Sequence, residues 1–221
     1  MFPYYLVIPT ISAFLCLIAG VICWQYLFPS IRISIFSVAL SITVDSICHL
    51  YFRGSLRLEH INNAIHNIYC LVDFFLLLFS TYSLLPHTFR DKLYKSTGIL
   101  FLGSWCIIIY FIRIYSFANY AVVVSSFLLT INFLTTLYYN EIKSISTHKI
   151  AVRYLCFSML IYFCGTFTLF IEIKPFLNYG MPEWFGDINT TFDTVKYLCL
   201  SVTFNKFKQQ YSANKQTVNG R

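Results

Sequence analysis

The sequence predicts an all-α, polytopic membrane protein: a bundle of seven transmembrane helices, with the N-terminus outside and the C-terminus in the cytoplasm. Of its 221 residues, 57% are hydrophobic and only 11% are charged, whereas soluble domains carry about 25% charged residues. The charges gather between apolar stretches of roughly 20 residues, the length that an α-helix needs to cross about 30 Å of hydrocarbon. Residues 74–79 are continuously apolar and so lack the strict alternation of a transmembrane β-barrel strand.

Seven apolar stretches make up the predicted bundle. The first is expected to remain as a span, because residues 1–5 lack the positive charge of a cleavable signal peptide. Pro29 separates the first stretch from the second, and Pro175 and Pro182 mark the loop before the last. Residues 1–205 therefore form one membrane domain, and residues 206–221 are expected to form a basic, disordered cytoplasmic tail. The predicted spans are residues 4–28, 32–52, 64–85, 98–114, 118–139, 152–173 and 189–204.

The orientation follows from the lysines and arginines, which accumulate in the cytoplasmic loops of membrane proteins. With the N-terminus outside, the four outer residues are Arg53, Arg57, Arg113 and Lys174. The eleven cytoplasmic residues are Arg32, Arg90, Lys92, Lys95, Lys143, Lys149, Arg153, Lys206, Lys208, Lys215 and Arg221. This bias predicts that the C-terminus lies in the cytoplasm.

The seventh span is the weakest, because it contains Asp193 and Lys196. If it did not cross, Lys196 and the basic tail would lie outside, and the count would become nine outside against seven inside. The positive-inside bias would then vanish. Seven spans are therefore expected.

Ionisable and polar side chains inside three of the spans are the main indication of function, because a charge at mid-bilayer costs several kcal/mol. Asp45 lies i,i+4 from His49, and Asp193 lies i,i+3 from Lys196, so each pair shares one helix face. The predicted ligand-binding residues are Asp45, His49, His66, Tyr69, Asp73, Asp193 and Lys196.

Three of these residues are expected at a similar depth in the outer half of the membrane. From a rise of 1.5 Å per residue, Asp45, Asp73 and Lys196 lie roughly 10, 13 and 11 Å from the outer ends of their spans. We therefore predict an outward-opening polar site between the second, third and seventh helices.

Two interpretations of this cluster remain open. The charges either neutralise one another and fix helix packing, or they form a site for a small molecule or an ion. Three carboxylates face one ammonium, so in a low dielectric either a carboxylate takes a proton or a cation enters.

Several other classes of ligand are not expected. No catalytic site, metal or cofactor is predicted. The eight cysteines form no CxxC motif, and we interpret them as small side chains that pack between the helices. The net charge of +7 is explained by topology, so no nucleic-acid partner is expected.

Two families of seven-helix proteins share part of this pattern of ionisable residues. Lys196 and Asp73 could fill the seventh-helix lysine and third-helix aspartate of microbial rhodopsins, but Asp193 lies three residues before Lys196 instead of four. His49 and Asp73 fit part of the zinc site of ceramidase-type hydrolases, yet the last span contains no histidine.

Short motifs spread over the chain carry another resemblance: Tyr4-Tyr5-Leu6, Ile8-Pro9, Asp45, Asn67-Ile68-Tyr69 before Asp73-Phe74, Leu137-Tyr138-Tyr139 and Tyr162-Phe163-Cys164-Gly165. With these, the chain resembles a group of uncharacterised seven-pass integral membrane proteins of Bacteroidota-type bacteria. That group usually has Glu-Phe at Asp73-Phe74, and asparagines where this chain has Asp193 and Lys196. Its members are often encoded near sensor kinases, so the resemblance implies a role in signalling. It also implies that the protein is inserted in a bacterial inner (cytoplasmic) membrane.

Two functions are therefore expected as alternatives. The first is a receptor-like or sensory protein whose basic cytoplasmic face passes a signal to a cytoplasmic or membrane partner. The second is an ion- or proton-coupled transporter that uses the buried charges as a relay, although the chain lacks a pair of helices broken by glycine or proline. An intramembrane metal hydrolase and a retinal-binding protein are further alternatives.

Overall fold

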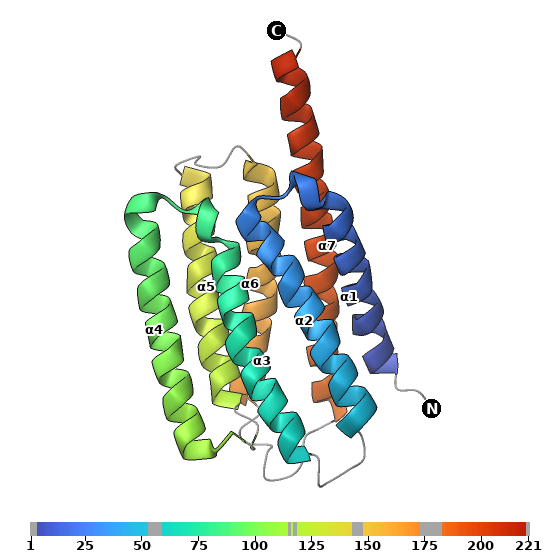
Figure 1. Ribbon diagram of the computed structural model, residues 1–221, viewed down its shortest axis with the longest axis vertical. Coiled ribbons are helices and arrows are strands. Elements are labelled where there is room, and N and C mark those ends of the chain that lie inside the picture. Colours follow the sequence, from blue (N-terminus) through green and yellow to red (C-terminus); the bar gives the residue numbers. More distant parts are fainter. Residues whose placement is uncertain are drawn as a thin grey trace.

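A computed structural model describes residues 4–52, 59–114, 116, 119–142, 148–172 and 183–219. Within these ranges the chain folds into seven α-helices and two short 3-10 turns, which confirms the all-α prediction (Figure 1). The elements are α1 (Tyr4–Cys23), η1 (Trp24–Tyr26), α2 (Pro29–Phe52), α3 (Glu59–Ser80), η2 (Tyr82–Leu84), α4 (His87–Ile112), α5 (Asn119–Ile142), α6 (Lys149–Glu172) and α7 (Glu183–Asn219).

Six of the described helices, α1 to α6, are apolar and long enough to cross a membrane. An α-helix needs about 20 residues for that purpose, and each of the six provides them. The chain is therefore an integral, multi-pass membrane protein. Helix α7 has ample length at 37 residues, but it is more polar than the others.

The helices pack as a closed ring with one helix outside it. Going round the ring, α1 packs against α2, α2 against α3, α3 against α5, α5 against α6, α6 against α7, and α7 returns to α1. Helix α4 packs against α3 and α5 at the edge of the bundle (Figure 1). Side chains of α2, α3, α6 and α7 can therefore meet inside the ring.

Helix α7 continues beyond the bundle, where the sequence predicts a disordered tail from residue 206 (Figure 1). Three contacts explain why the helix persists. Phe207 is fully buried, and the Gln210 side-chain oxygen accepts a hydrogen bond of 3.0 Å from the backbone N–H of Ala151. Tyr211 packs edge-on against Tyr26, with ring centroids 5.4 Å apart. Because Ala151 lies in the first turn of α6, Gln210 satisfies an amide that has no partner within its own helix.

Helices α3 and α4 begin earlier than the apolar stretches predict, at Glu59 and His87 instead of residues 64 and 98. At α4 the helix begins directly after Pro86, whose carbonyl accepts hydrogen bonds from Phe89 and Arg90 at 3.1 and 2.9 Å. Hydropathy marks only the part of a helix that lies in lipid. Hydropathy therefore does not predict the polar first turns of α4.

Helices α1, α2 and α7 approach one another closely at Gly20. A Cβ atom on Gly20 would lie 2.8 Å from Ile35 Cγ1 and 3.2 Å from Phe204 Cε2. Both distances are shorter than ordinary van der Waals contacts. Gly20 therefore lets the three helices approach closely, as small residues do between membrane helices.

We expect Gly20→Ala to lower the free energy of unfolding by about 1–3 kcal/mol, because the added methyl group overpacks this contact. The measurement is the thermal unfolding midpoint of the purified chain in detergent. Gly103→Ala in α4 is the matched control, since a Cβ there meets no atom within 4 Å. Equal midpoints for the two variants would contradict the close approach at Gly20.

Candidate functional site

A buried lysine stands at the centre of the polar cluster inside the ring. Lys196 of α7 is only 6% exposed, and its Nζ lies 3.1 Å from Asp193 Oδ1, one turn earlier on the same helix. The same Nζ lies 4.1 Å from the centroid of the Tyr162 ring and 4.5 Å from that of Tyr197. The ammonium is therefore held by one ion pair and two aromatic faces, which attract cations through their negative potential.

Tyr197 connects this lysine environment to α2. Its hydroxyl and Ser41 Oγ share a hydrogen bond of 2.7 Å, and both side chains are buried. Ser41 Oγ also lies 3.5 Å from Asp45 Oδ2, within the same face of α2. A chain of polar contacts thus runs from α7 to the carboxylate of Asp45.

Asp73 brings α3 into the same cluster. The Ser37 hydroxyl of α2 donates a hydrogen bond to Asp73 Oδ1, and Tyr69 lies one turn before Asp73 on the same face of α3. Asp73 is half-buried and lies close enough to Lys196 and Asp193 to interact with both electrostatically. Carboxylates in such surroundings form charge-assisted hydrogen bonds that are shorter and stronger than neutral ones.

Asp45 is where the cluster reaches the surface of the bundle. Its side chain is exposed, and it interacts electrostatically with Asp193, Lys196 and Asp73. A charged group that approaches Asp45 would therefore interact with all the charges of the cluster.

Five of the predicted ligand-binding residues come together in the structure: Asp45, Tyr69, Asp73, Asp193 and Lys196. The two predicted histidines differ from them. His66 is half-buried on α3, seven residues before Asp73, which places it about 10 Å farther along the helix axis. The His49 side chain lies outside the described residues, although its backbone belongs to α2.

Four members of the cluster were missed by sequence reasoning: Ser37, Ser41, Tyr162 and Tyr197. The two serines carried a signal, because they precede Asp45 by eight and four residues and so lie on its helix face. Tyr197 follows Lys196 directly. Tyr162 lies on α6, and only the packing of α6 against α7 brings its ring to the ammonium.

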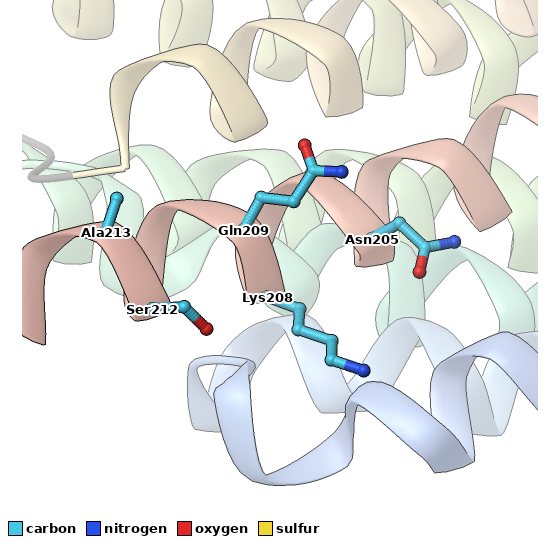
Figure 2. Close-up of a pocket in the computed structure, with 5 residues that line it drawn as sticks. All are labelled: Asn205, Lys208, Gln209, Ser212 and Ala213. Atoms are coloured by element: carbon cyan, nitrogen blue, oxygen red, sulfur yellow. The ribbon is translucent and has the colours of Figure 1, made fainter. Parts of the chain in front are cut away.

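A separate hollow of about 430 Å³ lies along the C-terminal half of α7, and its lining is shown in Figure 2. Its residues are Asn205, Lys208, Gln209, Ser212 and Ala213. Asn205 Oδ1 accepts a weak hydrogen bond from Cys23 Sγ at 3.8 Å. Because Asn205 follows Lys196 by nine residues, this hollow lies about 13 Å along the helix from the buried ammonium.

The arrangement can hold a positively charged group. Three carboxylates face a single ammonium, and serine and tyrosine hydroxyls supply further hydrogen-bond acceptors. An additional cation would balance the remaining negative charge without protonation of a carboxylate. Comparisons of this chain with family models, curated proteins and solved structures give no match.

We expect Asp193→Asn to lower the free energy of unfolding by about 1.5–3 kcal/mol, because it removes the carboxylate bonded to the buried Lys196 ammonium while Asp73 still compensates part of that charge. The double variant Asp193→Asn/Lys196→Met should recover most of this loss, since it buries no unpaired ammonium. Unfolding in detergent measures both changes. Asp91→Asn, in an ion pair whose aspartate side chain is 57% exposed, is the control and should cost about 1 kcal/mol or less. A double variant no more stable than Asp193→Asn would contradict the ion pair's role.

Proposed function

We propose that this protein is a small receptor-like or sensory membrane protein that binds a small cationic ligand, entering from outside, between α2, α3 and α7. The observation that carries the proposal is the imbalance around Lys196, where one buried ammonium faces Asp45, Asp73 and Asp193. Asp45 is exposed and gives the cluster an opening. Asp73 and Asp193 are half-buried, and partly desolvated carboxylates in excess of their cationic partners favour a cationic guest.

We infer that α7 crosses the membrane, with the N-terminus outside and the C-terminus in the cytoplasm of a bacterial cell. Helix α7 runs beside α1 and α6 along the bundle and continues past it at the end where η1 and η2 lie (Figure 1). The sequence places eleven lysines and arginines in segments at this end and four at the other. That asymmetry is the usual mark of the cytoplasmic side.

The continuity of α7 supports a receptor over a transporter. One unbroken helix of 37 residues, about 55 Å long, carries Asp193 and Lys196 near one end and a basic extension at the other. Transporters usually bind their substrates at interrupted helices, whereas α2, α3 and α7 are continuous through the cluster. A shift of α7 at the ligand site would reach its cytoplasmic extension, where a signalling partner could respond.

A screen for thermal stabilisation tests the proposal. The purified full-length chain in detergent is heated with organic cations: primary and quaternary amines, polyamines and amino acids. We expect at least one to raise the unfolding midpoint, since a ligand at 100 times its Kd stabilises by about 2.7 kcal/mol. Asp73→Asn should abolish the shift, and Asp91→Asn on the exposed surface should leave it unchanged.

Two results would overturn this assignment. The first is an unchanged midpoint across the whole set of cations. The second is uptake of a stabilising cation into proteoliposomes that is lost in Lys196→Met, which would establish transport instead of reception.

The orientation has its own test in fusions to the C-terminus. Green fluorescent protein joined after Arg221 should fluoresce, because it folds in the cytoplasm, and alkaline phosphatase at the same position should be inactive. The reverse pattern would show that α7 does not cross. A fusion after His148, in the α5–α6 connection, is the control and should report the cytoplasm in either case.

A further inference from the structure

A groove between α3 and α4 lies apart from the polar cluster, at the end of the bundle marked by η2. It has a volume of about 500 Å³, within the range of about 300–1,000 Å³ in which proteins bind small organic ligands. It is lined by Phe75, Phe79, Tyr82, Asp91, Tyr94, Lys95, Gly98, Ile99 and Leu102.

The walls of this groove are apolar and face outward from the bundle. Ile99 is 71% exposed, Leu102 45% and Phe79 43%. All three belong to helices long and apolar enough to span a membrane. Exposed side chains of this kind are in contact with acyl chains in a bilayer. The groove therefore opens towards lipid.

Gly98 makes the groove deep enough to hold a chain. It is buried between α4 and α3, and a Cβ atom there would lie 3.3 Å from Phe75 Cε1. Phe75 stacks beside Phe79, and Phe79 stacks on Tyr94, with centroid distances of 6.4 and 6.1 Å. The rings of Phe75, Phe79 and Tyr94 thus form a continuous aromatic wall beside the glycine.

The other end of the groove is polar and positively charged. Tyr82 donates a hydrogen bond of 2.8 Å to Asp91 Oδ1, and Arg90 Nε pairs with the same oxygen at 3.2 Å. Arg90 thereby neutralises Asp91, and its guanidinium lies 4.1 Å from the centroid of the Tyr82 ring. Lys95 is exposed one turn before Ile99, so its ammonium adds a net positive charge above the apolar walls.

We propose that this groove binds one anionic phospholipid, with an acyl chain between Phe79 and Ile99 over Gly98 and with its phosphate at Lys95. The order of the lining matches that of a leaflet: apolar towards the middle of the membrane, and cationic at the level of the headgroups. Basic pockets between membrane helices select anionic headgroups in this way. A protein partner would have to reach the walls through the bilayer, so lipid is the occupant that the position favours.

The test uses the full-length chain in detergent and two probes with identical acyl chains, phosphatidylglycerol and phosphatidylcholine. Thermal unfolding midpoints against lipid concentration give an apparent Kd for each. We expect the anionic lipid to bind about fivefold more tightly, the effect of one lysine near an anionic headgroup. Lys95→Gln should remove this preference and retain the weaker binding, while Gly98→Leu, which fills the groove, should weaken binding of both lipids.

Lys92→Gln is the matched control, because Lys92 is also exposed on the first turns of α4 but does not line the groove. It should keep the fivefold preference. If Lys92→Gln and Lys95→Gln reduced the preference for phosphatidylglycerol equally, the preference would come from diffuse charge and the site would be overturned. Equal affinity of the wild type for the two lipids would also overturn it. Stabilisation by glycerol 3-phosphate alone would show a free-anion site and would also overturn the proposal. Lys95 is exposed, so its variant does not depend on repacking of the bundle.

Discussion

The ammonium of Lys196 imposes the strongest single constraint on this structure. A charge buried among apolar helices is tolerated only when nearby groups compensate it. Asp193 supplies the opposite charge, and the rings of Tyr162 and Tyr197 supply the remaining attraction. These partners fix the rotation of α7 in the ring, since another face would leave the ammonium in lipid. The carboxyl group of Asp73 on α3 interacts electrostatically with the same ammonium.

Hydrogen bonds between side chains also join the helices elsewhere. Together they help to fix the arrangement of the helices in this small bundle. Buried Thr81 shares a hydrogen bond of 2.5 Å with Tyr94, and Asn132 donates one of 2.8 Å to Thr81, so that α3, α4 and α5 are linked. Asn67 of α3 donates to the carbonyl oxygens of Ile114 and Ser116, each at 2.8 Å, in the turn before α5. In a bilayer, apolar burial between helices contributes little, so packing and such bonds determine which helices meet.

Helix α7 both carries ionisable groups of the candidate site and makes anchoring contacts with neighbouring helices. Its N-terminal half carries the ionisable groups of the candidate site, and its C-terminal half is anchored by Phe207 and by the bond between Gln210 and Ala151. A helix that is polar at both ends would cross a membrane at a cost in transfer free energy. The ion pair and the two aromatic rings beside Lys196 would offset part of that cost. In the proposed orientation, the least apolar helix therefore connects the candidate site with the cytoplasm.

The sequence alone determined the fold class, because apolar stretches of membrane-spanning length permit only helices when their backbone groups must be satisfied internally. Helical spacing and depth also predicted that Asp45, Asp73 and Lys196 would converge, since both follow from a fixed rise per residue. Only the tertiary structure brought Tyr162 to the ammonium and placed α4 outside the ring, because neighbouring helices are chosen by packing, which hydropathy does not encode. The start of the helical extension of α7 was decided in the same way. Polar residues 206–219 predict no helix by composition, and contacts at Phe207, Gln210 and Tyr211 stabilise its first turns.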